Sequence, residues 1–343
     1  MQRWLERIWY RDTPPPGWLR PLARFYAWLS TRIAARKRAH AQHLSVPVIV
    51  VGNIAIGGTG KTPVTLWLVQ ELLRMGRRPG IVSRGYGGVG PFPREVSAES
   101  ATSECGDEPV LLASRIDAPV IVAPDRVAAA QLLLQQYPQT DVLICDDGLQ
   151  HYALARDFEI CVIDGARGYG NGCLLPAGPL RETKARAQAV QLLLINGGDT
   201  APYGERAERF DLRIGEAINL LSGEARPLTA FADSGAAAIA GIGNPQRFFA
   251  ALRASGLEVD EHGFPDHYVY SPEDLFFAGD APLLMTEKDA VKCQVFARPN
   301  WWQVPAQLQF GEAAAARIRA QLQALLSSTA AAGVHQPSVD LGA

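Results

Sequence analysis

A glycine-rich segment, residues 52–62, holds the side chains whose chemistry is easiest to read from the sequence. It follows the apolar run 47–51 and precedes residues 63–75, which have helical periodicity. The backbone N–H groups of such a loop, with the N-terminus of the next helix, form a cradle for phosphate oxygens. Lys61 is spaced to reach the β- and γ-phosphates, and the Thr62 hydroxyl to ligate Mg²⁺. We therefore predict that the protein binds a nucleoside triphosphate with magnesium and transfers its terminal phosphoryl group.

The details of this segment separate classes of nucleotide-binding protein. Ala55 stands where the usual motif has its first glycine, and Ile56 stands where partition ATPases carry a lysine that crosses a dimer interface. Residues 196–199 lack the lysine with which switch GTPases read guanine. Both classes are therefore disfavoured. The predicted nucleotide contacts are Ala55, Ile56, Gly57, Gly58, Thr59, Gly60, Lys61 and Thr62.

An acidic pair, Asp146 and Asp147, ends the apolar run 142–145. In a parallel sheet, a carboxylate at that position lies beside the phosphate loop, where it can hold Mg²⁺ directly or through water. Adjacent carboxylates point in different directions, so one serves the metal and the other the substrate side. The sequence does not say which.

Transfer to an alcohol also requires a base that accepts the hydroxyl proton. Asp107 and His267 are candidates, although from the residues alone a helix N-cap is the simpler role for Asp107, and a surface or core histidine for His267. Residues 85–90 formally fit a dinucleotide fingerprint, but prolines follow where a helix is required. We reject a nicotinamide site and expect a mobile loop.

Strand-like and helix-like segments alternate from residue 46 onward. Near-continuous apolar strands between helices predict an α/β fold with a mostly parallel sheet covered on both faces. We expect five parts: a helical arm (1–45), a phosphate-loop kinase core (46–200), a linker or hairpin (201–235), a smaller C-terminal α/β domain (236–326) and a disordered tail (327–343).

The first 45 residues differ from the rest in charge. They hold nine basic and two acidic side chains, in a chain whose net charge is −2. Four of the seven tryptophans fall in the first 28 residues, on segments with helical spacing. Aromatic and basic residues together are typical of a helix lying in a bilayer interface. A solvated arm packed on the domain is the alternative, and a basic head alone fits nucleic acid as well as anionic lipid.

The five scattered cysteines fit reduced thiols in the cytoplasm. The sequence has neither a signal peptide nor an apolar run of about 18 residues that would span a membrane. We therefore expect a cytosolic catalytic body.

An ordered set of motifs resembles the tetraacyldisaccharide 4′-kinases of lipid A biosynthesis, from the basic head to about residue 292. The motifs are Gly52-Asn-Ile-Ala-Ile-Gly-Gly-Thr-Gly-Lys-Thr-Pro63, Ser83-Arg-Gly-Tyr-Gly-Gly88, Gly106-Asp-Glu-Pro109, Asp146-Asp-Gly-Leu-Gln-His151, Leu175-Pro-Ala-Gly-Pro-Leu-Arg-Glu182, Gly241-Ile-Gly-Asn-Pro245, Phe264-Pro-Asp-His-Tyr268 and Thr286-Glu-Lys-Asp-Ala-Val-Lys292. That family does not keep the first glycine of the loop either, so Ala55 is no obstacle.

The resemblance implies transfer of the ATP γ-phosphoryl group to the 4′-hydroxyl of an acylated glucosamine disaccharide 1-phosphate, which gives lipid IVA. It implies that Asp107 is the base, supported by His267, and that Lys61 acts in catalysis. Thr62, Asp146, Asp147 and Glu182 become the predicted metal ligands, and Tyr86, Arg84 and Arg181 the predicted substrate contacts.

Because the substrate implied by the resemblance is a lipid, we expect the aromatic and basic arm (1–45) to bind an anionic membrane surface. The resemblance implies a peripheral enzyme at the cytoplasmic face of the bacterial inner membrane, and we infer neither a nucleic acid nor a protein partner. The alternative is a non-catalytic ATPase scaffold at the membrane surface. Acyl-chain preference, oligomeric state and the residues that read adenine are not apparent from the sequence.

Overall fold

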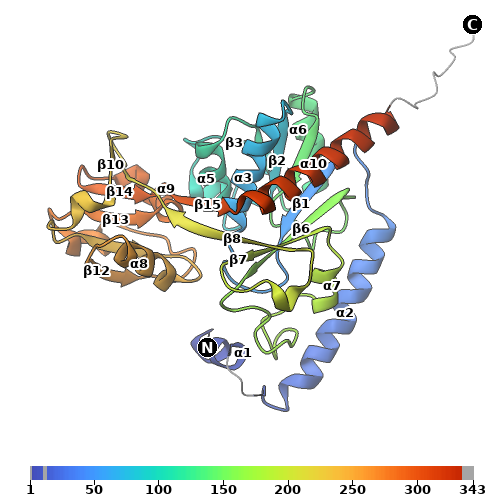
Figure 1. The fold of residues 1–343 in the computed structure, drawn as a ribbon, viewed down its shortest axis with the longest axis horizontal. Coiled ribbons are helices and arrows are strands. Elements are labelled where there is room, and N and C mark those ends of the chain that lie inside the picture. Colours follow the sequence, from blue (N-terminus) through green and yellow to red (C-terminus); the bar gives the residue numbers. More distant parts are fainter. Residues whose placement is uncertain (1, 11–13, 334–343) are drawn as a thin grey trace, which may run out of the picture.

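The apolar runs of the first half of the chain form one large sheet. The computed structural model describes residues 2–10 and 14–333. Its nine-stranded sheet has the order β15-β8-β7-β6-β1-β5-β2-β4-β3, parallel except for the antiparallel strands at its two edges (Figure 1). The strands are β1 (Val48–Gly52), β2 (Pro79–Ser83), β3 (Arg94–Val96), β4 (Val120–Val122), β5 (Val142–Cys145), β6 (Phe158–Asp164), β7 (Leu192–Asn196), β8 (Ala207–Ile214) and β15 (Ala306–Phe310). The predicted α/β fold with a mostly parallel sheet is confirmed.

Helices cover both faces of this sheet, which explains why its central strands are apolar on both sides. One face packs against α3 (Lys61–Arg74), α5 (Asp107–Arg115) and α10 (Glu312–Gly333). The other packs against α6 (Arg126–Gln136) and α7 (Lys184–Gln188). A short helix, α4 (Thr102–Cys105), precedes α5. Strand β1 therefore ends at the centre of a fully covered sheet, between β5 and β6.

A second, smaller unit has its own sheet, with the order β10-β9-β14-β13-β11-β12. Its elements are β9 (Ala217–Asn219), β10 (Ala225–Arg226), β11 (Ala237–Ala240), α8 (Pro245–Ala254), β12 (Asp260–Gly263), β13 (Leu283–Thr286), α9 (Glu287–Cys293) and β14 (Trp301–Val304). Short 3-10 segments of this unit are η2 (Leu228–Phe231), η3 (Pro272–Ala278) and η4 (Gln294–Phe296), whereas η1 (Ala201–Tyr203) lies between β7 and β8 of the large unit. Two apolar clusters, separate from those of the large sheet, fill this unit.

The smaller unit is an insertion and not a C-terminal domain, which corrects the predicted boundaries. The chain passes from β8 into it through residues 215–216 and returns through Pro305 into β15, which pairs with β8. Strand β8 lies inside the predicted linker 201–235, and β15 and most of α10 lie inside the predicted domain 236–326, yet all three belong to the large unit. The alternating strands and helices of residues 236–326 looked like one continuous domain, because periodicity in a sequence does not show which sheet a strand joins.

The C-terminal helix also differs from the prediction. We expected disorder from residue 327, whereas α10 continues to Gly333. Ile318 and Leu322 are fully buried against the large sheet, and Arg319 forms an ion pair with Glu71 of α3 at 2.7 Å. These contacts hold the helix on the large unit. Its many alanines also favour it, because alanine is the best helix former. Residues 334–343, the rest of the predicted tail, lie outside the described residues.

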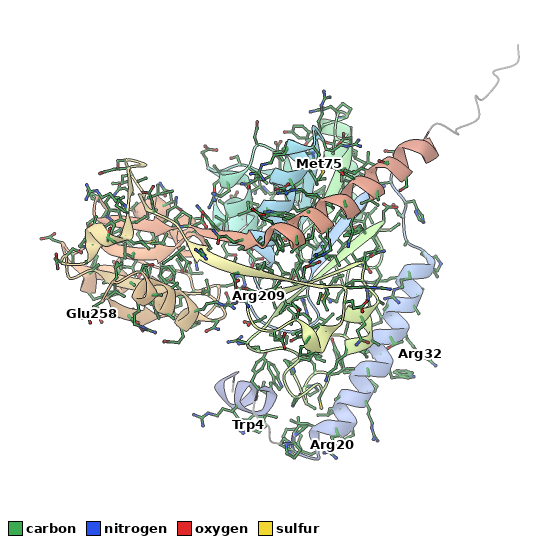
Figure 2. All side chains as sticks on the ribbon, in the orientation of Figure 1. Trp4, Arg20, Arg32, Met75, Arg209 and Glu258 are labelled. Atoms are coloured by element: carbon green, nitrogen blue, oxygen red, sulfur yellow. The ribbon has the colours of Figure 1, made fainter. Side chains whose placement is uncertain are left out.

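The N-terminal arm consists of α1 (Gln2–Trp9) and α2 (Leu19–Ala39). The arm is tied to the large unit by Trp9 Nε1, which donates to the carbonyl of Pro176 at 3.0 Å, and by Tyr26, whose hydroxyl donates to the carbonyl of Arg181 at 3.1 Å. Figure 2 shows Trp4 and Arg20 at the end of the arm and Arg32 on the outer side of α2. The large apolar side chains of the arm that remain exposed are Trp4, Trp18, Leu22, Phe25, Trp28, Leu29 and Ile33.

Within residues 2–10 and 14–333, no helix combines the length and the apolar character that crossing a membrane would need.

Candidate active site

The glycine-rich loop joins the central strand β1 to α3, which begins at Lys61. Gly60 has φ +95°, and a Cβ at this position would lie 2.7 Å from Nδ2 of Asn196, at the end of β7. That amide nitrogen donates to the carbonyl of Thr59 at 3.0 Å. Inside the loop, Asn53 Nδ2 donates to the carbonyl of Gly57 at 3.3 Å. The structure therefore holds all the predicted nucleotide contacts, residues 55–62, in one tightly wrapped turn and the start of a helix.

The acidic pair lies beside this loop because β5 pairs directly with β1. Asp146 is 1% exposed and accepts a hydrogen bond from the Thr65 hydroxyl at 2.8 Å. Burial raises the pKa of Asp146 to about 7, and the negative charge of Glu108 adds to the effect. A buried carboxylate of this kind is more easily ionised when a cation is present.

Asp147 has the opposite electrostatic environment. Its φ is +46°, and its Oδ1 lies 3.5 Å from Lys61 Nζ and 3.4 Å from Arg181 Nη2. Burial alone would raise the pKa of Asp147, but Lys61, Arg181 and Arg126 outweigh it and lower the value to about 2. The two neighbouring carboxylates are thus distinguished by their partners, as expected if they have different roles.

The neighbouring residues Arg181 and Glu182 have different surroundings. Arg181 bonds to Asn53, with Nη2 at 3.2 Å from the carbonyl oxygen, which ties it to the glycine-rich loop as well as to Asp147. Glu182 instead accepts from the Tyr152 hydroxyl and lies 3.6 Å from Arg186. Its Oε1 is buried and has no hydrogen-bond partner among the described residues. The structure therefore brings Arg181 to the acidic pair, while the described contacts of Glu182 are with Tyr152 and Arg186.

Asp107 and His267 meet across the boundary between the two units. Asp107 is the first residue of α5, and His267, with φ +59°, belongs to the inserted unit. The Nδ1 atom of His267 lies 3.1 Å from Oδ2 of Asp107, which is 6% exposed. Gly106 is the N-cap of α5, so the simpler N-cap role for Asp107 is wrong, and His267 is not an isolated histidine.

The ionisation of this pair follows from its contacts. Burial alone would raise the pKa of Asp107, but the hydrogen bond from His267 and the charge of Lys288 outweigh it and hold the pKa below its usual value. The hydrogen bond to Asp107 raises the pKa of His267, although burial and Lys288 oppose that shift. Asp107 is therefore an ionised carboxylate at neutral pH, able to accept a proton.

The loop after β2 brings two further predicted residues to the pair. Tyr86 is 59% exposed, and its ring centroid lies 5.1 Å from that of His267. The loop approaches α5 so closely that a Cβ on Gly106 would clash with the carbonyl oxygen of Tyr86. The Arg84 guanidinium lies 6.0 Å from the Tyr86 ring. Tyr86 thus lies beside the ring of His267, and Arg84 lies beside Tyr86.

The inserted unit also touches the glycine-rich loop. A Cβ on Gly243 would lie 2.7 Å from the backbone nitrogen of Gly58. Arg167 donates to the carbonyl of Gly243 at 3.1 Å, and Arg247 of α8 donates to the carbonyl of Asn196 at 3.0 Å. The loop and the Asp107–His267 pair therefore both lie where the two units meet.

Sequence reasoning did not find several residues that the structure places in the site. Thr65, one helical turn after Lys61, holds Asp146, and the i, i+4 spacing was the available signal. Asn196 supports the loop from the end of β7, whereas from the sequence residues 196–199 were compared only with the guanine-binding motif of GTPases. Lys288 lies among the acidic residues around His267, although its motif was noted only as part of a resemblance.

Comparison with known proteins decides the family. The sequence matches the tetraacyldisaccharide-1-P 4′-kinase family over residues 17–326. The chain belongs to this family. The tetraacyldisaccharide 4′-kinase of Methylobacillus flagellatus is 49% identical, with 94% of this chain and 97% of that protein aligned. The enzyme of the same name from Pseudomonas aeruginosa is 47% identical, over 94% and 98% of the two chains.

A solved structure agrees with this assignment. The crystal structure of LpxK from Aquifex aeolicus, described as a complex with ATP, superposes with a TM-score of 0.72 at 26% identity. It covers 90% of this chain and 97% of that protein. Family membership confirms the predicted recognition and the predicted class, a kinase that phosphorylates a hydroxyl group. ATP, the predicted donor, is the nucleotide named for the Aquifex protein.

Proposed function

We propose that the chain transfers the γ-phosphoryl group of ATP to the 4′-hydroxyl of an acylated glucosamine disaccharide 1-phosphate, forming lipid IVA. The named activity of its relatives supports this acceptor. The observation that carries the proposal is the hydrogen-bonded pair Asp107–His267, held at the boundary where the glycine-rich loop also meets the inserted unit. An acceptor-activating base and a phosphate-binding loop are the two parts that a kinase needs together.

The donor site is built by the loop and its neighbours. The backbone N–H groups of residues 55–62 and the N-terminus of α3 hold the phosphates, and Lys61 reaches their outer oxygens. Arg181, which already contacts Asp147, lies close enough to the loop to bind a phosphate as well. This cluster of positive groups stabilises the charge that spreads over the phosphoryl oxygens during transfer.

The side chains present fit a magnesium ion. Thr62, Asp146 and Asp147 offer the oxygen ligands that Mg²⁺ prefers, and the buried, free Oε1 of Glu182 is a further candidate ligand. When bound, the metal supplies neutralisation of phosphate charge and orientation of the triphosphate. A bound cation would stabilise the ionised form of Asp146 in particular, because burial otherwise favours its protonated form.

At the acceptor, Asp107 accepts the proton of the 4′-hydroxyl group while the sugar oxygen forms its bond to the γ-phosphorus. The bond between that phosphorus and the bridging oxygen breaks, and ADP leaves with the electron pair. His267 orients the Asp107 carboxylate through its Nδ1 atom. Tyr86 and Arg84 contact the sugar and its substituents beside the pair.

The exposed aromatic residues of α2 and the turn before it bring the enzyme to its substrate. Trp18, Phe25 and Trp28 are each at least half exposed, and arginines surround them on the same helix. Apolar side chains of this kind insert into the interfacial layer, and each basic group near an anionic leaflet adds about 1 kcal/mol of attraction. We place the enzyme as a peripheral protein on the cytoplasmic face of the inner membrane, where its lipid substrate lies.

The direct test uses the purified full-length chain in detergent with Mg²⁺ and ATP labelled at the γ-phosphate. We expect label on an added acylated glucosamine disaccharide 1-phosphate, and none when the acceptor's 4′-hydroxyl is replaced by hydrogen. Release of free phosphate alone, under conditions in which a homologous kinase labels the lipid, would overturn the proposal in favour of a non-catalytic ATPase scaffold.

A further inference from the structure

Lys288 lies at the centre of the contact between the two units. It is the second residue of α9, and its side chain is 15% exposed. Its Nζ atom lies 3.1 Å from Oε1 of Glu108 and 3.8 Å from Oδ2 of Asp107, both on α5 of the large unit. The same atom lies 3.2 Å from Oδ1 of Asp266 and 3.4 Å from Nε2 of His267, both of the inserted unit. One ammonium group therefore contacts both halves of the Asp107–His267 pair.

The acidic surroundings keep this group charged. Burial alone would lower the pKa of Lys288, but Glu108, Asp107 and Asp266 outweigh it and raise the pKa above its usual value. Lys288 is thus a cation at neutral pH. It cannot serve as a base, and it can only donate hydrogen bonds.

Because Lys288 can only donate hydrogen bonds, it influences which ring nitrogen of neutral His267 carries the proton. A neutral imidazole carries one N–H and one lone pair, and its tautomer is set by the partners of its two nitrogens. In the neutral ring, Nε2 faces an ammonium group that has no lone pair to offer, so Nε2 is the acceptor. The proton then resides on Nδ1, which donates to the Asp107 carboxylate. At Nε2, Lys288 opposes the proton that the other neighbour, Asp266 at 3.9 Å, favours, and it thereby reinforces the tautomer that Asp107 favours at Nδ1.

We propose that Lys288 is a positioning residue that assembles the base across the two units, holding His267 as its Nδ1–H tautomer so that the imidazole donates to Asp107. This role rests on the proposed function of Asp107 as the base. It assigns to α9 of the inserted unit a part in the chemical step, although Lys288 itself is enclosed by the carboxylates of Asp107, Glu108 and Asp266.

The charges around the pair give the proposal a pH signature. His267 is faced by Asp107 from α5, by Lys288 from α9, by Asp266 from its own loop and by the Tyr86 ring from the loop after β2. Lys288 lowers the pKa of both Asp107 and His267. Removing its charge raises both values. Since Asp107 must be ionised to accept a proton, the acidic limb of the kcat profile then moves to higher pH.

The test compares Lys288→Met, which keeps most of the length of the side chain without charge or N–H donor, with a matched control. Arg115→Met is that control, because Arg115 forms a further ion pair between α5 and α9, with Glu287, and no contact among the described residues joins it to His267. For Lys288→Met we expect kcat to fall about 10- to 100-fold, the loss typical of a misplaced catalytic group, with the KM for ATP unchanged. We expect its acidic limb to shift upward, and Lys288→Arg to recover most of the activity.

A second readout needs no activity. Nitrogen-15 NMR of the wild-type chain, with the His267 signal assigned by its loss in His267→Gln, should show a protonated Nδ1 and an unprotonated Nε2 at a pH where the ring is neutral. In Lys288→Met we expect a mixture of tautomers, and in Arg115→Met the wild-type pattern.

The outcomes separate this inference from the proposed function. A protonated Nε2 in the wild-type chain overturns the inference even if Lys288→Met does not fold. Equal losses and equal pH profiles in Lys288→Met and Arg115→Met also overturn it, since they would show that Lys288 only fastens the units together. The expected tautomer in a protein that labels no lipid would instead refute the proposed function and leave the tautomer assignment standing.

Discussion

Replacing Phe25 and Trp28 by serine tests whether the arm binds membrane through its exposed apolar face. Both lie on α2, 61% and 51% exposed, with ring centroids 5.9 Å apart. An aromatic side chain covers about 200 Å² when fully buried, so roughly half of that is available to lipid on each residue. At about 25 cal/mol per Å², full immersion of the pair contributes roughly 5 kcal/mol. A helix lying flat immerses about half of this area, which predicts a loss of about 2 to 3 kcal/mol, or roughly 30- to 150-fold in partitioning.

The assay is co-sedimentation of the full-length chain with vesicles that contain a fixed fraction of anionic lipid. The control is Phe276→Ser, which removes an aromatic residue of similar exposure, 52%, from η3 of the inserted unit. We expect the control to sediment like the wild type and the double variant to remain largely in solution. If the arginines alone held the protein, the double variant would bind as tightly as the wild type at low salt, and both would be released together as salt rises. That result would refute the reasoning.

Three further changes test the site and the fold. Asp107→Asn should lower kcat about 10²- to 10⁴-fold, the usual contribution of a general base, without changing the Kd for ATP measured by calorimetry, and an equal loss in both would remove Asp107 from the base role. Gly243→Ala should weaken ATP binding, because its Cβ would lie 2.7 Å from a backbone nitrogen of the glycine-rich loop, whereas Gly311→Ala, with open space around it, should bind ATP normally. Leu322→Ala should cost about 2 to 5 kcal/mol of unfolding free energy in urea titrations, and exposed Gln321→Ala almost none; two equal midpoints would mean that α10 does not pack on the core.

The central part of the fold was accessible from the sequence because its signals are local. Strand β5 has the predicted bounds, and α3 and β1 differ from the predicted segments by only one or two residues at each end. These elements have continuous apolar runs or helical periodicity between glycine or proline boundaries. That β1 and β5 lie in one parallel sheet then follows from the preference for parallel strands joined by helical crossovers.

The parts that sequence reasoning missed depend on contacts distant in the chain. Strand β8 alternates exposed and buried residues and was read as a linker, because only its pairing with β15, some ninety residues later, identifies it as part of the large sheet. The hydrogen bond between Asp107 and His267 spans 160 residues, and no local pattern in either segment predicts it. The resemblance to a family supplied both residues, but Lys288, which contacts both, became apparent only in three dimensions.

The short double connection at residues 215–216 and 305 has a consequence for synthesis of the chain. The backbone nitrogen of Gly215 donates to the carbonyl of Pro305 at 2.8 Å, so the inserted unit leaves and re-enters the large sheet at one point. A ribosome must therefore complete the insertion before β15 and α10 can cover the edge strand β8 and the apolar face beneath α10. Until then the nascent kinase exposes an unpaired strand edge, which is a template for aggregation. Replacing residues 215–305 by a two-residue turn would join β8 to β15 as a hairpin, and should yield a large unit that closes its sheet as soon as it is made.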